Sequence, residues 1–311
     1  MTVVVFGSIN LDLVVEVPRL PVKGETIVGN RFFSAAGGKA ANQAVAVANL
    51  EVPVSLVGQV GDDSFGETLI KSLQTAGVNT SGITVNAETY SGIASIVVDE
   101  MGANTIACAA GANNLVREAE LEQFKTLLPT AKIVLLELGI PIATVLNAAR
   151  EAKAHDCFVI LDPAPVIANF PEELYSLVDL MTPNEIEASQ LVGFTVDGVT
   201  TARQAASFLH QMGIQNVVIT LGDRGALYSN SESSYWLKPI PVSVVDTVAA
   251  GDAFNGALAA GLASGKSLME SLQWASVGGA LAVTKSGAQG SLPIKKSFDR
   301  LLARQKLPIE E

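Results

Sequence analysis

The sequence contains few of the residues that build metal sites, disulfides or membrane spans. Its 311 residues include two cysteines, Cys108 and Cys157, and two histidines. The cysteines lie far apart without metal-ligand spacing and two histidines cannot complete a zinc cluster, so we interpret both cysteines as buried small hydrophobes. No stretch approaches about 18 uninterrupted apolar residues, and the first apolar run ends before Asn10 and Asp12, which predicts neither a membrane span nor a signal peptide. We therefore expect a cytoplasmic protein.

Positive charge is also scarce. Twenty lysines and arginines face 31 aspartates and glutamates, which gives a formal net charge of −11 and a pI of about 4.7. Such a chain repels nucleic acid and anionic membrane surfaces, so we expect neither as a partner. Hydrophobic residues, by contrast, make up 49% and the mean hydropathy is +0.37, which favours a sheet buried on both faces. The length allows one large α/β domain or two smaller ones.

The stretch 246–256, with the sequence DTVAAGDAFNG, joins a predicted strand, a turn and a predicted helix. Residues Val242–Val245 are β-branched or small and predict the strand, while Phe254–Leu262 has helical spacing of Ala, Leu and Gly. Asp252 then lies in the first helical turn. The turn before it consists of residues with almost no side chain: Ala249, Ala250 and Gly251. A ligand can approach their N–H groups closely at the positive end of the helix dipole, which predicts an anion hole.

A carboxylate beside an anion hole repels phosphate, so it is unusual for binding alone. It suits a base that takes a proton from a hydroxyl group attacking that phosphate, and Asp252 is the candidate. The alternative from this stretch alone is that Asp252 caps the helix, as aspartate often does. The combination of a carboxylate with an anion hole favours phosphoryl transfer. The other motifs of the chain help to decide whether Asp252 is a base or a helix cap.

Two further segments supply candidate ligand contacts. Asn10 and Asp12 follow a predicted buried strand, and their i, i+2 spacing points both side chains the same way, as a polyol pocket requires. An Asx turn is the alternative for this pair. Gly38, Lys39 and Asn42 stand at the start of a predicted helix, where Lys39 supplies the scarce positive charge. Tight packing of that helix on the sheet is the alternative reading of its glycines.

Four short segments read as strands without intervening helices, so they predict a small sheet set apart from the main one as a lid. The lid strands lie within 12–34 and 91–109, namely Val14–Val17, Glu25–Phe33, Ser91–Val98 and Ala103–Ala109. Exposed edges of such strands often pair, which makes a homodimer through the lid plausible.

The middle of the chain alternates strands with helices, which implies a parallel sheet. The predicted segments are Ile133–Leu136, Ile142–Ala154, Phe158–Asp162, Glu185–Val192, Ala202–Met212 and Val217–Thr220. No repeat or linker divides the sheet, so we expect one α/β domain over 1–311 with a lid.

These stretches resemble the ribokinase-like sugar kinases of the phosphofructokinase B family, and specifically the ribokinase branch. The resemblance rests on eight motifs in family order: 7–10 (GSIN), 37–44 (GGKAANQA), 61–63 (GDD), 162–165 (DPAP), 182–185 (TPNE), 220–222 (TLG), 246–256 and 287–289 (GAQ). It implies a doubly wound, mostly parallel sheet flanked by helices, with a small β-sheet lid. It also implies ATP and Mg²⁺ as cofactors.

The resemblance extends to individual residues at the nucleotide end of the site. It implies that Asn184, Thr220 and Gly222 contact ATP, and that Glu187 holds Mg²⁺ through water. It further implies a K⁺ site enclosed by Asp246, Val248, Ala282, Lys285, Gly287 and Ser291. Each assignment has an alternative. Glu187 could simply belong to an acidic first helical turn, Thr220 and Gly222 could form a glycine turn into the strand Ala226–Ser229, and the loop at 282–291 could close over the nucleotide.

An ATP-dependent sugar kinase accounts for the base, the anion hole, the metal carboxylate and the sugar pocket together. A noncatalytic sugar or nucleotide sensor would not need Asp252, and a redox enzyme lacks its Gly-x-Gly-x-x-Gly motif after the first strand. One departure concerns the substrate, because Gly139 occupies the position where ribokinases usually carry a glutamate, with Glu137 two residues earlier. On the assumption that this vacates space for an extra hydroxymethyl group, we narrowly expect fructose, with ribose as the alternative and nucleosides further behind.

Overall fold

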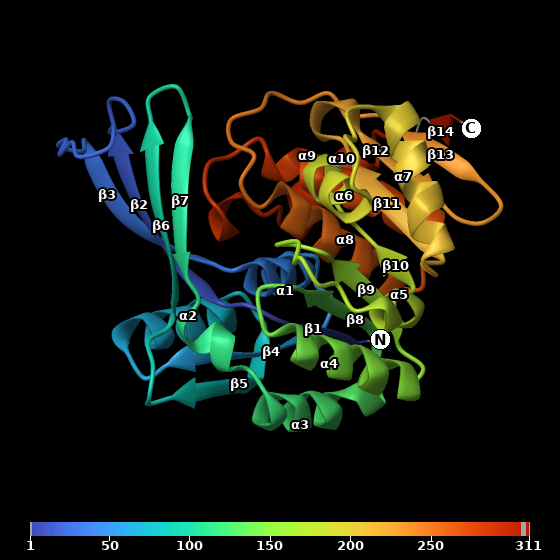
Figure 1. Ribbon diagram of the computed structural model, residues 1–311, viewed down its shortest axis with the longest axis horizontal. Coiled ribbons are helices and arrows are strands. Elements are labelled where there is room, and N and C mark those ends of the chain that lie inside the picture. The colour runs from blue at the N-terminus through green and yellow to red at the C-terminus, as the bar shows by residue number, and fades with distance from the viewer. Residues whose placement is uncertain (1, 306–308, 311) are drawn as a thin grey trace.

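The computed structural model of the protein describes residues 2–305 and 309–310, and these form two β-sheets (Figure 1). In the described residues the larger sheet has ten strands in the order β14-β13-β12-β11-β10-β9-β8-β1-β4-β5. Their bounds are β1 Thr2–Phe6, β4 Val54–Gly61, β5 Asn79–Asn86, β8 Ala131–Glu137, β9 Phe158–Asp162, β10 Leu180–Met181, β11 Asn216–Thr220, β12 Ala226–Ser229, β13 Ser234–Leu237 and β14 Ile309–Glu310.

Neighbouring strands from β11 to β5 are all parallel, while β12, β13 and β14 continue the sheet in antiparallel pairing. Residues on the two faces of the same strand enter different cores: Val3 and Val5 join one, Val4 and Phe6 the other. Burial on both faces explains the apolar strands and the low charge content. The expected doubly wound architecture is confirmed.

Helices cover both faces of this sheet. One face carries α1 Lys39–Asn49, α2 Ser64–Thr75, α8 Ala250–Ala263, α9 Leu268–Ala282 and α10 Lys295–Leu302. The opposite face carries α3 Glu118–Leu127, α4 Ile142–Ala154, α5 Glu172–Leu177, α6 Glu185–Val192 and α7 Val199–Gln211.

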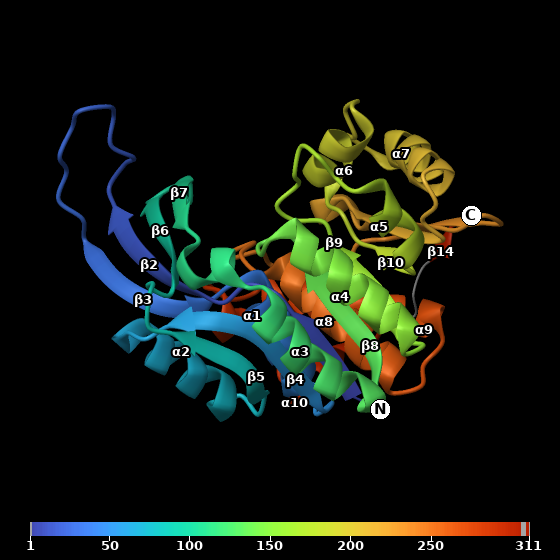
Figure 2. The ribbon, with the colours of Figure 1, turned by 60° about the horizontal axis from the view of Figure 1, so that its bottom comes forward.

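The second sheet has the order β3-β2-β6-β7 and projects from one end of the main sheet (Figures 1 and 2). Its strands are β2 Asn10–Val17, β3 Arg31–Gly37, β6 Gly92–Asp99 and β7 Asn104–Ala109. The inner pair, β2 and β6, is parallel, and the two outer pairs are antiparallel. We call these four strands the small sheet. β2 begins earlier and β3 ends later than expected, and Asn10 pairs with Gly37 at this end of the two strands.

The contact between α1 and α8 positions the residues of the site. Gly256 of α8 lies so close to α1 that an added methyl group would sit 2.5 Å from Ala46 Cβ and 2.8 Å from the Gln43 carbonyl oxygen. Only glycine permits this approach, because real Cβ atoms essentially never come that close. The small residues of both helices thus bring the first turn of α8 against the first turns of α1.

Three expectations were wrong. Val242–Val245 is irregular rather than a strand, although Val245 N donates to the Val283 carbonyl and so holds the segment in place. The predicted strand Glu25–Phe33 begins only at Arg31. Cys108 is exposed on β7, whereas Cys157 is buried as expected. The two segments have the composition of strands, but among the described residues parts of them have no adjacent strand to pair with. Cys108 is a small apolar residue, but no other described part of the chain covers it.

Among the described residues, no helix is long and apolar enough to cross a membrane.

Candidate active site

Asp252 lies in the first turn of α8, but its side chain turns away from its own helix. The N-cap residue is Ala249, which makes no side-chain capping hydrogen bond. Asp252 Oδ2 accepts a hydrogen bond from Asn42 Nδ2 at 2.8 Å, and Oδ1 accepts one from Gln43 Nε2 at 3.3 Å. Burial raises the pKa of Asp252, against the opposing effects of Lys39, Asn42 and Gln43. A buried carboxylate of this kind can accept a proton from a hydroxyl group.

Lys39 places one positive charge among several carboxylates. Its ammonium lies 3.6 Å from Asp162 Oδ2, while the side chain remains 40% exposed. Asp162 is the largest influence that raises the pKa of Lys39, and Asp252, Glu187 and Glu137 act in the same direction. Lys39 therefore stays charged and partly offsets the repulsion between these groups.

Two of these carboxylates are deeply buried at the ends of neighbouring strands. Asp162 ends β9 and Glu137 ends β8, and burial raises the pKa of each to about 7, with Lys39 opposing the rise. Glu137 Oε1 accepts a hydrogen bond from Ser8 N at 2.5 Å, and Oε2 accepts one from Gly139 N at 2.7 Å. Both carboxylates therefore titrate near neutral pH, well above the ordinary range for these side chains.

Asn10 and Asp12 lie on β2 as the i, i+2 pair that the sequence predicted, in extended chain and not in an Asx turn. Asn10 Oδ1 accepts a hydrogen bond from Asn113 Nδ2 at 2.7 Å. Burial, followed by the charge of Asp252, raises the pKa of Asp12 to about 6. Gly38 completes this end with φ 92°, where a methyl group would lie 2.7 Å from Asn10 N. The predicted sugar contacts and the candidate base thus lie at one edge of the sheet.

Gly139 does not open onto the space that the fructose expectation assumed. It follows the end of β8, and a Cβ atom there would lie 2.7 Å from Glu137 Oε2 and 2.9 Å from both Cβ and Oγ of Ser8. The first atom of any side chain at this position would therefore meet occupied space. The Glu137 side chain lies beside Gly139, and its two oxygens accept hydrogen bonds from Ser8 N and Gly139 N.

The turn before α8 is strained. Ala249 has φ 59° and ψ 13°, a left-handed conformation that costs a non-glycine residue about 1 kcal/mol or more. Gly251 is exposed, and a methyl group there would meet no atom within 4 Å. Gly251 in the first turn of α8 is therefore open to a ligand, as an anion hole requires, while Ala250 N donates to the Thr247 carbonyl oxygen at 3.3 Å.

Asp246 ties this turn to the loop after α9. Its Oδ1 accepts a hydrogen bond from Val248 N at 3.0 Å, and its Oδ2 accepts one from Gly287 N at 2.8 Å. Nearby, Lys285 N donates to the Ala282 carbonyl at 3.3 Å, and Ser291 Oγ donates to the Ala288 carbonyl at 2.8 Å. The two segments predicted to enclose a monovalent cation therefore lie against each other. Among the described residues, no group of three or more His, Cys, Asp or Glu side chains is arranged to hold a metal.

Asn184 and Glu187 form a capping box at the start of α6. Asn184 Oδ1 accepts hydrogen bonds from the Ile186 and Glu187 N–H groups, and Glu187 Oε2 accepts one from Asn184 N, each at 2.8 Å. The capping role thus engages one oxygen of Glu187 and leaves the other for a further ligand. Asn184 also forms a parallel bridge with Thr220, and Gly222, with φ 59°, faces open space. The predicted nucleotide residues are thus brought together.

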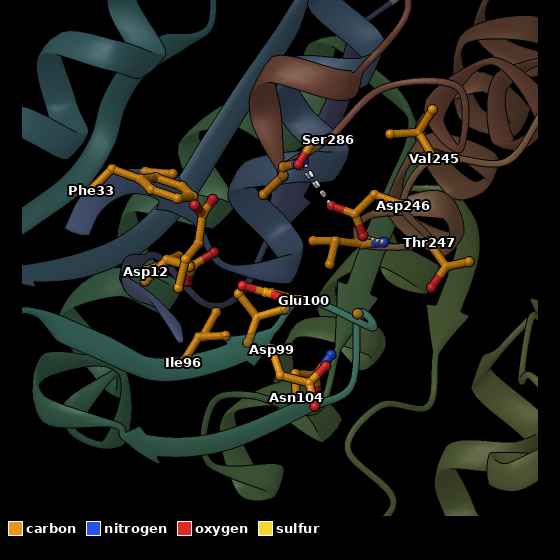
Figure 3. A pocket seen from close by; sticks show the side chains of 18 of the residues that line it. Asp12, Phe33, Ile96, Asp99, Glu100, Asn104, Val245, Asp246, Thr247 and Ser286 are labelled. Atoms are coloured by element: carbon orange, nitrogen blue, oxygen red, sulfur yellow. Dashed lines mark hydrogen bonds between the residues drawn. The ribbon is translucent and has the colours of Figure 1, made fainter. Parts of the chain in front are cut away.

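A cavity of about 450 Å³ lies between the small sheet and the segment before α8 (Figure 3). Asp12, Phe33 and Ile96 line it from the small sheet, and Val245, Asp246 and Ser286 line it from the opposite side. Its lining carries the carboxylates of Asp12, Glu16, Asp99, Glu100 and Asp246. Carboxylates accept hydrogen bonds from hydroxyl groups and repel phosphate, so this cavity suits a polyol.

Three residues that were not predicted from the sequence also join the site: Gln43, Asn113 and Asp162. Gln43 and Asp162 lie within the motifs 37–44 and 162–165, and Asp162 ends a buried parallel strand, which is the same signal that predicted Asn10. Asn113 comes from the short helix Gly111–Leu115, where no local pattern points toward the site. Its proximity depends on tertiary structure alone.

Residues 1–295 match the model of the pfkB family of carbohydrate kinases, and the chain belongs to this family. It is an ATP-dependent sugar phosphotransferase. Its relatives place it in the ribokinase branch: it is 38% identical over 295 residues to a ribokinase of Haemophilus influenzae, covering 95% of this chain and 96% of that one. It is also 32% identical over 303 residues to a deoxyribokinase of Salmonella typhi, covering 97% and 99%.

The fold agrees with this assignment. The structure of Arabidopsis thaliana ribokinase complexed with ribose and ATP superimposes with a TM-score of 0.88 at 34% identity, covering 96% of this chain and 98% of that one.

Proposed function

We propose that this kinase transfers the γ-phosphate of ATP to the primary hydroxyl group of D-ribose. The observation that carries the choice of ribose over fructose is the occupied space at Gly139, where a Cβ atom would lie 2.7 Å from Glu137 and 2.9 Å from Ser8. The occupied space removes the reason to expect the larger furanose, which was room for an additional hydroxymethyl group. The ribokinase names of its relatives favour the same substrate.

In the proposed reaction, Asp252 takes the proton from the sugar hydroxyl, whose oxygen attacks the γ-phosphorus of ATP. The bond between that phosphorus and the β,γ-bridging oxygen breaks, which yields a sugar phosphate and ADP. Asn10, Asp12, Lys39 and Asn42 bind and orient the sugar. The N–H groups of Ala249, Ala250 and Gly251 stabilise negative charge on the transferred group.

Asn184, Thr220 and Gly222 are the proposed nucleotide contacts. Glu187 has a carboxylate oxygen left over from its capping role, so it fits a Mg²⁺ ion held through water; that ion would offset phosphate charge. For K⁺, the supporting observation is the contact of the loops that carry Asp246, Val248, Ala282, Lys285, Gly287 and Ser291. Because the reaction consumes ATP, we expect the protein to be in the cytoplasm.

The small sheet is proposed to act as a lid within one catalytic domain and to pair with a second copy of the chain. Phe32 of β3 is 64% exposed and Ile106 of β7 is 52% exposed, so apolar side chains remain uncovered on its strands. Covering such a surface is a frequent reason for association. Sedimentation of the parent and of Phe32→Glu at matched concentration tests this, and a parent that remains monomeric at micromolar concentration contradicts it.

The substrate is tested by measuring kcat/KM for D-ribose, 2-deoxy-D-ribose, D-fructose and adenosine with ATP and Mg²⁺. We expect ribose to exceed fructose by at least about tenfold, or about 1.4 kcal/mol in transition-state binding. A fructose value equal to or above that of ribose contradicts the proposal. A preference for deoxyribose would align the protein with its deoxyribokinase relative, and sugar binding without turnover would indicate a sensor.

A further inference from the structure

Gln43 lies between two buried carboxylates that belong to different elements. Its Nε2 is 2.9 Å from Asp162 Oδ2 at the end of β9 and 3.3 Å from Asp252 Oδ1 on α8. A carboxamide nitrogen carries two hydrogens, so it can donate one to each carboxylate. The residue itself is 0% exposed. One side chain thus links the proposed base to a second acidic group.

The orientation of this amide follows from the charges around it. If it were rotated by 180°, its oxygen would face two carboxylates, which is repulsive, so the nitrogen must face them. Gln43 Oε1 is then left without a hydrogen-bond partner in the described residues, although it is buried. Leaving a buried acceptor unpaired is unfavourable. An apolar side chain of the same length would avoid this cost, so packing alone does not account for a glutamine here.

Besides Asp252 and Asp162 themselves, the charges that face this link come from four elements: α1, β2, α6 and β8. Asp252 is influenced by Lys39 of α1 and lies near Asp12 of β2. Asp162 is influenced by Lys39 as well as by Asp252, Glu187 of α6 and Glu137 of β8. Lys39 is thus one cation among several acids, and its ammonium lies 3.6 Å from Asp162. The hydrogen bonds from Asn42 and Gln43 therefore supply the remaining stabilisation of the Asp252 carboxylate.

We propose that Gln43 is a positioning residue, anchored by Asp162, that fixes the carboxylate of Asp252 in the orientation and charged state in which it accepts a proton. Asn42 holds one oxygen of Asp252 and Gln43 holds the other, so together they prevent rotation of the carboxylate about its Cβ–Cγ bond. The inference rests on the proposed function, in which Asp252 is the base.

The test is Gln43→Met, which has nearly the same shape and no hydrogen-bond donor. Loss of the donor destabilises the charged form of Asp252, so the acid limb of the pH profile of kcat/KM for ribose moves to higher pH, by about 0.5 to 1 unit. At pH 7 we expect kcat to fall about tenfold with KM for ribose within a few-fold of the parent. The midpoint of thermal unfolding is expected to stay close to that of the parent, because the unpaired oxygen is removed together with the donor.

Gln59→Met is the matched control. Gln59 of β4 is also buried, and it donates to Glu120 at 2.8 Å and accepts from Asn86 at 3.1 Å, with neither partner in the site. This variant loses comparable hydrogen bonds and is expected to keep the parental pH profile.

The inference is overturned if the acid limb of the kcat/KM profile has the same pH midpoint in Gln43→Met as in the parent. This holds both for a variant whose kcat falls equally at all pH values and for one whose kcat is unchanged. A limb that moves equally in Gln59→Met also overturns it. Failure of the proposed function has a different signature: full activity in Asp252→Asn, or a parent that phosphorylates no sugar, removes the base assignment before Gln43 is considered.

Discussion

The two ends of the site are built in different ways. At the sugar end, Asp252 and Asp162 are 6% and 4% exposed, and side-chain hydrogen bonds join them across α1, α8 and β9. At the nucleotide end, Gly222 and Gly251 face open space, and Asp246 holds the loops through backbone N–H groups. One end is enclosed and held by side chains, while the other is open and built mainly from backbone.

The difference corresponds to what each end is proposed to do. A proton acceptor needs a defined orientation and a shifted pKa, which burial and specific side chains provide. A nucleotide is large and anionic, and backbone N–H groups at a helix start can bind it without many specific side chains. Substitutions at the enclosed end should therefore affect catalysis, and changes at the open end should affect binding and rate more weakly.

The strongest test of this comparison is Asp252→Asn. It keeps the shape of the side chain but removes the proton acceptor, so we expect kcat to fall about 10²-fold or more, while sugar and ATP binding remain close to parental values. Steady-state kinetics together with calorimetric titration of each ligand separates the two effects. Turnover within a few-fold of the parent would show that the enclosed end does not contain the base.

A second test uses stability instead of rate. Asp162 has a pKa of about 7 in the folded protein against an ordinary value of 3.8, so the folded state binds more protons between these values and stability falls as the pH rises through that window. Asp162→Asn removes this contribution. We expect the variant to gain about 3 kcal/mol in free energy of unfolding relative to the parent between about pH 4.5 and about pH 7.5.

Urea unfolding of both proteins at several pH values measures this difference. Glu137, whose charge contributes to the raised pKa of Asp162, is present in both proteins. A constant difference across the pH range would mean that folding does not raise the pKa of Asp162.

The smallest expected effect belongs to the open end. K⁺ is proposed to order loop 282–291 against Val248 and so to fix the anion hole, and we expect it to raise kcat a few-fold over Na⁺. Assays in the two chloride salts at equal ionic strength give the comparison. Equal rates would remove the cation site and leave Asp246 as a purely structural link between the two loops.

Much of this organisation was predictable from sequence. The helices Ile142–Ala154 and Glu185–Val192 and the strand Phe158–Asp162 have the predicted bounds, because periodicity and end signals agree there. Val242–Val245 has the composition of a strand but no neighbouring strand among the described residues to pair with, and this depends on the whole sheet. Composition therefore fails where pairing partners decide the outcome.

The site divides in the same way. Asp252 and Lys39 were predicted as site residues because strand ends and helix starts mark the edge of a parallel sheet where ligands bind. The link through Gln43 was not identified, because it depends on the distance between α1 and α8. The fructose preference inferred from Gly139 is less well supported than ribose for a related reason: the position of Glu137 beside Gly139 depends on side-chain packing and not on the residue types alone.

The topology of the small sheet has a consequence for how the chain folds. β2 with β3, and β6 with β7, are each close neighbours in sequence, so these two pairs can form from local contacts. The parallel pairing of β2 with β6 joins residues such as Asn10 and Gly92, and the intervening α1, β4, α2 and β5 belong to the main body. Closing that long loop becomes favourable once the body has formed. The small sheet should therefore assemble late in folding and be among the first units to exchange its amide hydrogens with solvent.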